Sequence, residues 1–559
     1  WCISRQLWWG HRIPVWRLKT STGVAWSEWN LPFSWSELVP TTDMQEGQGI
    51  EKSLSGLPGH TTSFRTYGVL NAEWRLRESD VFAATDSPTE EKELQARGFT
   101  QDPDVLDTWF SSWLWPFATM GWTGDADTDA KNTMLKAFYP TTDLVTGPDI
   151  IFFWVARMIM AGYEYRGDLP FRNVYFTGII RDKQGRKMSK SLGNSPDPLD
   201  LIAKYGADAL RFGVMRSAPL GQDILFDEQA VELGRNFCNK LWNACRFRQM
   251  QGAATPEIPA AAVEAEIDPT LLTSDDKWIL LRLDQAIHEI TQAFAEYRFS
   301  EATSTLYRFF WSEYCDWYVE ATKAVFSGTD ASRKANTLAV IDFVLGHLLR
   351  LFHPFLPFIT EELWHGMGFH ADLPEDQGGR TLMTAPWPKP FSGAEKRHFA
   401  LDDAADQVAQ AKYDLVSLGR GLKRDCKLDS RRKVKFCFKP AGELAEAETE
   451  VIRLLLNAEA LEIVGRDWTP SKGTPVSGNA LGELFLPLAG LIDVGAERAR
   501  LGNELDKIRI EVAKVQEKLA NPAFTQKAPA KVLEEHQRRL AEWQAKEQQV
   551  LAAMANLPE

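Results

Sequence analysis

The clearest hydrophobic pattern in the chain is a pair of heptad series near its end. Apolar residues of the first series recur at intervals of four and three: Leu501, Leu505, Ile508, Val512, Val515 and Leu519. The residues of the second series again lie at heptad intervals: Leu533, Leu540, Trp543, Val550 and Met554. Pro522 and Pro529 lie between the two series and would interrupt a single helix. Residues 491–559 are therefore predicted to form an antiparallel coiled-coil hairpin.

Residues 227–390 show helical spacing almost throughout. The longest amphipathic runs are 275–297, 300–326 and 333–352. A stop at His353–Pro354 precedes another helix from about Thr360, and residues 255–268 have the composition of a loop. This pattern predicts a helical bundle, followed over 391–490 by a small α/β module with a helix and short strands.

The first 226 residues alternate between strand-like and helix-like segments. Residues 173–180 (NVYFTGII) are β-branched and aromatic, which predicts a buried strand. Residues 149–163 are apolar nearly all round, so this helix should be buried, and residues 198–212 resume helical spacing. Residues 18–100 show no clear period and are predicted to be an irregular insertion with a few strands.

A basic loop follows the strand 173–180. It reads Gly-Arg-Lys-Met-Ser-Lys-Ser-Leu-Gly-Asn over 185–194 and places Lys187 and Lys190 beside Ser189 and Ser191. Loops at the carboxyl ends of strands are where open α/β sheets bind ligands, and two ammonium groups suit a triphosphate. The alternative, a solvated surface loop, is weaker because of the flanking glycines and the preceding strand.

The charge distribution is more informative than the net charge of −13 over 559 residues. Residues 420–435 hold eight lysines and arginines against two aspartates. Residues 491–559 are neutral, with eleven basic and eleven acidic side chains. These local basic surfaces remain compatible with a polyanionic partner, although a solvated basic patch at 420–435 is nearly as plausible a reading.

Several protein classes are disfavoured by the composition. The six cysteines form no Cys-x-x-Cys pair, which argues against a zinc site and against a disulfide framework. The longest apolar run, 150–162, is too short for a membrane span and contains Arg157. No signal-peptide pattern is present, so a cytoplasmic location is expected.

Taken together, the motifs resemble those of class I aminoacyl-tRNA synthetases, and among them the valyl-tRNA synthetase family. The pentapeptide 187–191 matches the KMSKS signature of the class without deviation. The valyl resemblance comes from WCISRQLWWGHRIP at 1–14, DTWFSS at 107–112, GPDIIFFWVARMIM at 147–160, and the NPAF turn at 521–524 with KAPA at 527–530.

This resemblance implies a fold and a domain order. Residues 1–226 would be the second half of a Rossmann-type α/β catalytic domain, with the insertion at about 18–100. Residues 227–390 would be an α-helical anticodon-binding domain, 391–490 a small α/β junction module, and 491–559 a coiled-coil tRNA-binding arm. The other signature of the class, a His-x-Gly-His tetrapeptide, is not in the sequence. The chain is therefore expected to begin after an editing domain and to lack adenylation activity alone.

The implied activity is ATP-dependent attachment of valine to its tRNA through a valyl-adenylate. Two alternatives stay open: a truncated tRNA-binding module without chemistry, and isoleucyl specificity. The retained DTWFSS and GPDIIFFW motifs favour the enzyme, because RNA binding alone would not require them.

The resemblance also assigns residues to roles. Lys187 and Lys190 would be catalytic, stabilising charge on the ATP phosphates. The ATP site would comprise Gly147, Asp149, Gly178, Lys187, Met188, Ser189, Lys190 and Ser191, with Asp149 on ribose and Gly178 against adenine. For Asp149 the competing reading is a helix cap. The valine pocket would be lined by Trp109, Ile150 and Trp154, although any one tryptophan could serve only in core packing.

The expected ligands and partners follow from the same resemblance. They are ATP with Mg²⁺, which ATP itself would carry, together with valine and tRNA. No zinc, no other protein-bound metal and no membrane contact are expected, and the complete protein would be a monomer.

Overall fold

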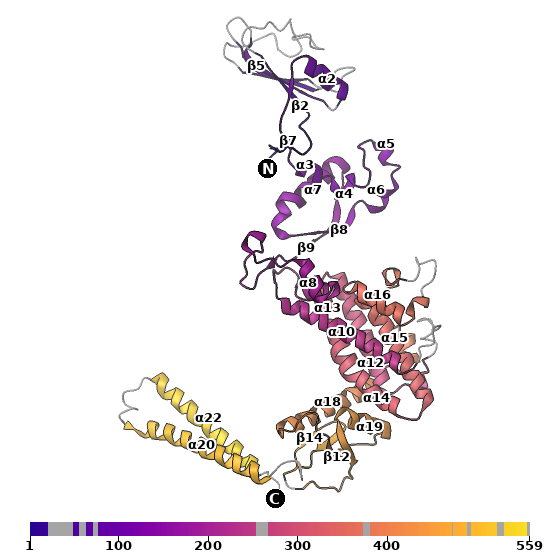
Figure 1. Ribbon diagram of the computed structural model, residues 1–559, viewed down its shortest axis with the longest axis vertical. Coiled ribbons are helices and arrows are strands. Elements are labelled where there is room, and N and C mark those ends of the chain that lie inside the picture. Colours follow the sequence, from indigo (N-terminus) through magenta and orange to yellow (C-terminus); the bar gives the residue numbers. More distant parts are fainter. Residues whose placement is uncertain are drawn as a thin grey trace. The chain divides into compact units, whose positions relative to one another are not determined.

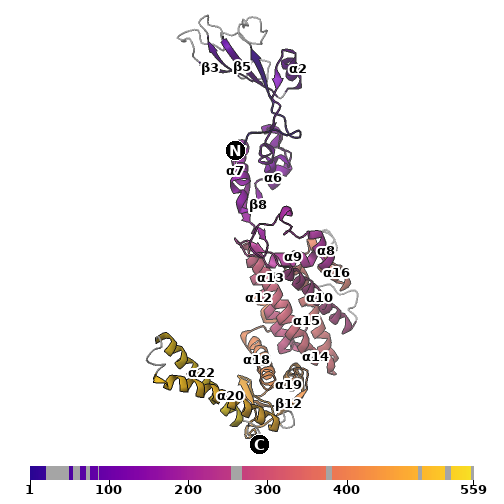
Figure 2. The same ribbon diagram turned by 60° about the vertical axis from the view of Figure 1, so that its left-hand side comes forward.

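The computed structural model describes residues 1–20, 49–54, 63–70, 76–85, 87–252, 267–372, 381–471, 473–488, 494–522 and 530–555. The chain separates into two compact units, Trp1–Thr177 and Gly178–Glu559, each of which is described by itself. The elements of both units are labelled in Figure 1 and seen from a second direction in Figure 2. The division falls inside the predicted catalytic segment 1–226, so the basic loop belongs to the second unit.

The first unit contains an antiparallel sheet where an irregular insertion was predicted. Its strands are β2 (Val15–Thr20), β3 (Gly49–Leu54), β4 (Ser63–Leu70), β5 (Leu76–Ala84) and β6 (Thr100–Gln101), and their order is β3-β4-β5-β2-β6. Helix α2 (Pro88–Ala96) precedes β6 and is capped by the Ser87 side chain. The prediction of a few strands is confirmed, but the prediction of irregular structure is wrong for the described strands, whose polar composition hid their alternation.

The first unit also contains a small α/β part. Strand β1 (Ser4–Arg5) pairs antiparallel with β7 (Val105–Leu106), and the short helices are α3 (Trp109–Ser112), α4 (Trp115–Ala118), α5 (Ala126–Asp129) and α6 (Thr133–Phe138). Strand β8 (Thr141–Thr146) then pairs in parallel with β9 (Phe171–Phe176). An ion pair of 2.9 Å between Arg5 Nε and Asp107 Oδ2 joins the start of the chain to the segment before α3.

The connection between β8 and β9 is helical, as predicted, but it is not buried on all sides. It begins as a 3₁₀ turn (Pro148–Ile150), passes through a π-helical turn (Ile151–Val155), becomes α7 (Ala156–Ala161) and ends in a second π-helical turn (Gly162–Arg166). Val155, Arg157 and Ala161 are buried, whereas Phe152 is 61% exposed and Phe153 is 53% exposed. The all-round apolar pattern was read as burial on every side, but the unit covers only one face of this helix.

The second unit begins with the strand β10 (Ile180–Arg181), which pairs in parallel with β11 (Ile224–Leu225). Helices α8 (Pro198–Tyr205) and α9 (Ala207–Arg216) lie between these strands, and α10 (Glu228–Met250) follows β11. The predicted strand 173–180 is thus divided between β9 and β10, which belong to different units.

The predicted helical bundle is present, and its core is continuous. Its further helices are α12 (Ser274–Ala295), α13 (Phe299–Tyr307), a π-helical stretch (Arg308–Tyr318), α14 (Val319–Ser327), α15 (Ala331–Phe352) and α16 (Pro357–Gly366). Short 3₁₀ turns lie at Pro269–Leu271, Phe369–Asp372 and Leu382–Thr384. Helix α15 is long and apolar enough to span a membrane, but 72% of its most apolar stretch is buried, as befits the central helix of a bundle.

Helix α9 is fixed to the bundle by polar contacts at the start of α16. The Asp208 carboxylate accepts hydrogen bonds from the backbone N–H groups of Phe358 (3.4 Å) and Ile359 (2.7 Å). Arg211 donates to the carbonyls of Pro354 (3.0 Å) and Phe355 (3.3 Å). A carboxylate satisfies the free N–H groups of a helix start and is favoured there by the helix dipole.

The small α/β module follows the bundle. Its helices are α17 (Gly393–His398), α18 (Asp403–Asp425) and α19 (Glu446–Leu455). Its strands β12 (Val434–Pro440), β13 (Ala458–Ile463), β14 (Val476–Asn479) and β15 (Gly482–Phe485) form a mixed sheet in the order β13-β12-β15-β14. Phe436, Phe438 and Leu484 are fully buried and continue the core of the bundle.

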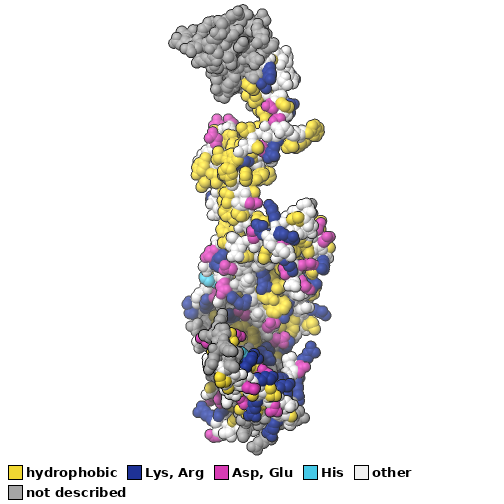
Figure 3. All heavy atoms as spheres, turned by 90° about the vertical axis from the view of Figure 1, so that its left-hand side faces the viewer, with side chains coloured by type: hydrophobic (Ala, Val, Ile, Leu, Met, Phe, Trp, Pro, Cys, Tyr) yellow, Lys and Arg dark blue, Asp and Glu magenta, His cyan; other side chains and the backbone are white. Residues whose placement is uncertain are grey.

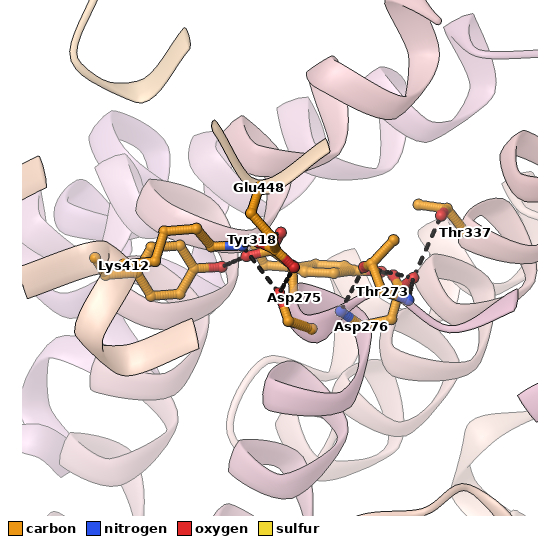
Figure 4. A network of polar contacts seen from close by, with 9 residues as sticks. Thr273, Asp275, Asp276, Tyr318, Thr337, Lys412 and Glu448 are labelled. Atoms are coloured by element: carbon orange, nitrogen blue, oxygen red, sulfur yellow. Dashed lines mark hydrogen bonds and ion pairs between the residues drawn. The ribbon is translucent and has the colours of Figure 1, made fainter. Parts of the chain in front are cut away.

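One buried ammonium group joins the module to the bundle (Figure 4). The Lys412 side chain, on α18, is 1% exposed, and its Nζ lies 2.8 Å from Asp275 Oδ2 on α12 and also pairs with Glu448 on α19. The Tyr413 hydroxyl donates to the other oxygen of Asp275. Burial alone would lower the pKa of Lys412, but Asp275 and Glu448 raise it above its ordinary value. Lys412 therefore stays charged.

The C-terminal hairpin is present as predicted, with helices α20 (Val494–Ala520) and α22 (Ala530–Ala555). Five residues of the first series are buried: Leu501, Leu505, Ile508, Val512 and Val515. The first four pack with Val550, Leu540 and Trp543 of the second series. Most of the predicted turn, 523–529, lies outside the described residues.

We predict that Lys412→Met lowers the free energy of unfolding by about 3–5 kcal/mol, because it leaves the Asp275 carboxylate buried without its cation. The matched control is Lys323→Met, which breaks an exposed pair with Glu320 and should cost less than about 1 kcal/mol. Urea unfolding followed by circular dichroism measures both variants. Equal losses would show that the buried contact is not special.

A second prediction concerns acid. Burial lowers the pKa of His347 to about 3, whereas the unfolded value is near ~6.5. Between these values the unfolded chain takes up a proton that the folded chain does not. The stability of the bundle should therefore fall as the pH drops below ~6.5, by about 1.4 kcal/mol per pH unit from this group.

The variant that isolates this effect is His347→Gln, which keeps a donor for the Phe343 carbonyl that lies 2.8 Å from His347 Nδ1 but does not titrate. Its urea midpoint should decline less between pH 6.5 and pH 5 than that of the parent chain. Parallel declines would contradict the assignment.

Candidate functional site

The basic loop is closed by a single carboxylate at its start. Asp182 accepts hydrogen bonds from the backbone N–H groups of Gln184 (3.0 Å) and Arg186 (2.9 Å). It also accepts from Arg186 Nε (2.7 Å) and from Asn194 Nδ2 (3.0 Å). The hydrogen bond from Asn194, with the backbone and side-chain contacts of Arg186, lowers the pKa of Asp182 to about 2. The carboxylate is therefore ionised at neutral pH and holds both ends of the loop together.

Asn194 continues the closure from the other end. Its Oδ1 accepts from the Ser189 N–H (2.9 Å), and its Nδ2 donates to the Lys187 carbonyl (3.3 Å). The hydroxyls of Ser189 and Ser191 are 2.7 Å apart and bond to each other. This contact links two residues of the loop to each other, and the expected place of both serines in the ATP site stays a prediction.

The signature lysines lie on this closed loop. Lys187 is exposed, its backbone bridges to Arg181, and it forms no ion pair with a described residue. Met188 is partly buried. Lys190 begins the 3₁₀ turn Lys190–Leu192, but its side chain lies outside the described residues. The Lys187 ammonium is therefore available to an anionic ligand, and the matching role of Lys190 stays a prediction.

The base of the loop, at Lys183, contacts the first turn of α10. Lys183 Nζ lies 3.0 Å from Oδ1 of Asp227, whose side chain caps this helix by accepting from the Gln229 N–H. Asp223 accepts from the Ile179 N–H (3.0 Å) and forms an ion pair with Arg181. These contacts fix the position at which the loop leaves the sheet.

Gly178 lies beside this base, and its lack of a side chain has a structural reason. A Cβ at this position would lie 2.0 Å from the Gln222 carbonyl oxygen, so only glycine fits. The close neighbour is thus the chain's own backbone. The expected contact of Gly178 with adenine is not needed to explain the glycine, and it stays a prediction.

The first unit holds the other candidate nucleotide residues, directly after β8. Gly147 precedes the 3₁₀ turn Pro148–Ile150, in which Asp149 is exposed and makes no capping hydrogen bond. Among the described residues Asp149 has no partner. The cap reading of Asp149 is therefore not supported, and its carboxylate remains free to accept from ribose hydroxyls.

The three predicted pocket residues differ in their surroundings. Trp109 is buried and donates from Nε1 to the Cys2 carbonyl (2.7 Å). The Arg157 guanidinium contacts the rings of both Trp1 and Trp109, at 4.5 and 4.7 Å from their centroids. Trp109 is thus a rigid part of the packed interior, held by its own hydrogen bond and by cation–π contact.

Ile150 and Trp154 lie instead on the helical segment on which Phe152 and Phe153 are exposed. Trp154 is 36% exposed and Phe152 is 61% exposed. Hydrophobic side chains gather visibly over this unit in Figure 3. Trp109, Ile150 and Trp154 make no ring or polar contact with one another, and their common valine pocket stays a prediction.

No group of three or more His, Cys, Asp or Glu side chains within the described ranges is arranged to hold a metal ion. The described part of the loop carries lysines and hydroxyls, which bind phosphate oxygens.

Sequence reasoning missed Asp182, Asn194 and Arg157. For the first two a signal existed, since a carboxylate and an amide lie just outside the glycines that flank the loop. Arg157 was noted only as an interruption of an apolar run. Its position between two indoles depends on tertiary contacts with Trp1 and Trp109.

We predict that Asp182→Asn opens the loop, because a neutral amide cannot accept all four hydrogen bonds of the carboxylate. Limited proteolysis with trypsin should cut after Arg186 and Lys187 roughly tenfold faster than in the parent chain. Asp200→Asn, on exposed α8, should leave the cleavage rate unchanged. Similar rates for all three proteins would show that Asp182 does not hold the loop.

Comparison with known proteins agrees with this organisation. Residues 1–49 and 66–227 match the model of class I tRNA synthetases (I, L, M and V). Residues 276–437 match the anticodon-binding domain of tRNA ligases, and residues 493–558 match the valyl tRNA synthetase tRNA binding arm. Only 50–65 of the predicted insertion falls outside the first match.

Individual relatives point to the same family. The chain is 38% identical over 551 residues to a valine–tRNA ligase of Chlorobaculum tepidum, covering 97% of this chain and 53% of that protein. It is 39% identical over 561 residues to a valine–tRNA ligase of Bacteroides fragilis, covering 100% of this chain and 54% of that protein. The chain thus spans about half the length of the curated relatives it matches.

Among solved structures, a leucyl-tRNA synthetase of Agrobacterium radiobacter aligns with 83% of this chain and 50% of its own, at 17% identity and a TM-score of 0.43. The family assignment therefore rests on the sequence matches alone. By those matches the chain belongs to the class I aminoacyl-tRNA synthetases, in their valyl-tRNA synthetase branch.

Proposed function

We propose that the chain is the part of a valine–tRNA ligase that carries the KMSKS loop and the tRNA-binding domains. The observation that carries this proposal is the closed loop 182–194, which holds Lys187 exposed and without an ion-pair partner among the described residues. The carboxylate of this loop, Asp182, is taken up by Gln184, Arg186 and Asn194 and not by Lys187. The Lys187 ammonium is therefore left for phosphate oxygens.

In the proposed reaction, a carboxylate oxygen of valine attacks the α-phosphorus of ATP. The bond from this phosphorus to the bridging oxygen breaks, and pyrophosphate leaves with the electron pair. The reaction needs alignment and charge stabilisation more than a covalent catalyst. Lys187, and Lys190 by the motif match, would stabilise the charge that develops on the leaving phosphates.

The substrate-binding residues of the first unit have separate proposed roles. Asp149 would accept hydrogen bonds from ribose hydroxyls, and Trp109 and Trp154 would contact the valine side chain with flat apolar surfaces. Such a pocket cannot strongly reject threonine, for which valyl-tRNA synthetase is a standard example with about 10² discrimination.

The valyl group would then pass to the 3′-terminal adenosine of a tRNA. The anticodon-binding match at 276–437 and the arm match at 493–558 support tRNA as the macromolecular partner. We further propose a monomer in the cytoplasm, with Mg²⁺ carried by ATP.

The exposed apolar face of residues 150–163 supports a requirement for further polypeptide. Phe152, Phe153, Met160 and Tyr163 are each more than half exposed on this segment. Apolar patches of this kind mark interaction surfaces. The valine–tRNA ligases that match are about twice as long, so we infer that their N-terminal half covers this face and completes the catalytic domain.

The test is ATP–pyrophosphate exchange with valine. The 559-residue chain alone should show no exchange, and addition of the N-terminal half of a related valine–tRNA ligase should restore it. In the reconstituted enzyme, Lys187→Ala should lower exchange on the order of 100-fold, as expected for loss of one charge-stabilising donor. Lys183→Ala, at the base of the same loop and paired with Asp227, is the control and should lower exchange far less.

Other outcomes separate the alternatives. Robust exchange by the isolated chain would contradict the need for further polypeptide. Exchange with isoleucine in preference to valine would contradict the proposed specificity. Binding of tRNA without exchange, even after reconstitution, would support a non-catalytic tRNA-binding module.

A further inference from the structure

A cavity of about 710 Å³ opens on the α/β module, away from the basic loop in the sequence. It is formed by the last turns of α18, the loop 427–430 and the end of α19 at 455–457. Four cationic residues contribute to its wall: Arg420, Lys423, Arg424 and Lys427. Asp429 is the one acidic residue that lines it. The wall therefore carries a clear positive excess in a chain whose net charge is −13.

Lys423 is the least usual of these residues. It is 3% exposed, and its Nζ donates to the carbonyls of Ser430 (3.0 Å) and Arg432 (2.7 Å). An ammonium group has three N–H donors, so one is not used by these contacts. No carboxylate within the described residues forms an ion pair with it. Burial lowers the pKa of Lys423, and nearby Asp429 only partly opposes this effect.

Part of this charge has a role in folding. Arg420 donates to the Leu455 carbonyl from Nη2 (2.8 Å) and Nε (3.3 Å), and its guanidinium lies over the Trp317 ring. Cations near helix ends satisfy free carbonyls and are favoured by the helix dipole. Arg420 and Lys423 thus stabilise the cavity wall itself.

Arg424 and Lys427 have no comparable role. The Arg424 side chain is 83% exposed, and its ion-pair contact is a long one of 4.0 Å to neighbouring Asp425. Lys427 is exposed and has no side-chain partner among the described residues. Its backbone has φ of +55°, the left-handed conformation that ends helices and favours glycine. Folding alone therefore favours glycine at 427, and the lysine adds only a charge at the cavity.

We propose that this cavity binds a backbone phosphate of RNA, with Arg424 and Lys427 contacting the phosphate oxygens and buried Lys423 supplying further positive potential. A phosphodiester is the anion that fits best, because the cavity is open and larger than one phosphate, so a sugar–phosphate chain can pass through it. Arg431 and Lys433 follow the cavity-lining residues directly in the chain and are exposed, so they add positive charge next to this segment. The identity of this RNA as tRNA rests on the proposed function above.

The test compares tRNA binding by the 559-residue chain and its variants over a series of salt concentrations. The double variant Arg424→Gln with Lys427→Gln should bind tRNA about tenfold more weakly, and its plot of log affinity against log salt should be flatter by about one to two units. Arg466→Gln removes one exposed charge beyond the far end of β13 and should change affinity less than about twofold.

A second variant separates binding from folding. Lys427→Gly relieves the left-handed backbone and removes the charge, so its melting temperature should stay equal or rise while tRNA affinity falls. A residue with only a structural role would move both readings in the same direction. A lower melting temperature together with weaker binding would therefore contradict the proposal.

The remaining outcomes separate failure of the cavity assignment from failure of the proposed function. Tight tRNA binding that the double variant retains unchanged would overturn the cavity assignment and leave the proposed function intact. Failure of the parent chain to bind tRNA would overturn both. Inorganic phosphate at constant ionic strength should weaken tRNA binding by the parent chain more than binding by the double variant, because it competes for Arg424 and Lys427. Equal weakening in both proteins would show that tRNA does not contact this cavity and would overturn the RNA assignment.

Discussion

The packing of the second unit depends on one buried charge, the ammonium group of Lys412. Lys412 brings together α12, α18 and α19 through Asp275 and Glu448, and Tyr413 completes the set. A buried ammonium is costly unless its partners lie at hydrogen-bonding distance, so the three helices have little freedom to shift relative to one another. Helix α18 carries Lys412 and also contributes Arg420, Lys423 and Arg424 to the cavity wall, to which Leu455 at the end of α19 contributes as well. The ion pair that joins α18 to α19 thus connects two elements of the cavity wall.

The same principle, one ionised side chain that gathers several partners, operates at the KMSKS loop on a smaller scale, where the ionised group is the Asp182 carboxylate. Asp182 and Asn194 accept from the backbone N–H groups of Gln184, Arg186 and Ser189. These N–H groups are therefore not available to a ligand, whereas the Lys187 ammonium is exposed. Glycine-rich loops differ in this respect, because they bind phosphate through their main chain.

Features that repeat along the chain could be predicted from the sequence, because local periodicity records which face is buried. The heptads of α20 and α22 and the runs that became α12 to α15 are of this kind. Burial of residues 149–163 could not be predicted, since the period shows that a face is apolar but not what covers it. Non-local polar contacts were also missed: Lys412 lies 137 residues from Asp275, and nothing near either residue signals the other. The motifs identified Lys187 correctly as a loop residue, but they carried no information about the residues that hold the loop.

The Asp227 carboxylate links the KMSKS loop to helix α10. Its Oδ1 accepts from the first turn of α10 and pairs with Lys183 at the base of the loop. Helix α9 is in turn hydrogen-bonded to the start of α16 through Asp208. Helix α10 has 23 residues, so it is about 35 Å long, and a helix barely stretches. Helix α10 is itself part of the bundle core through Phe237, Leu241 and Cys245, so the position at which the loop begins is tied to the packing of the bundle.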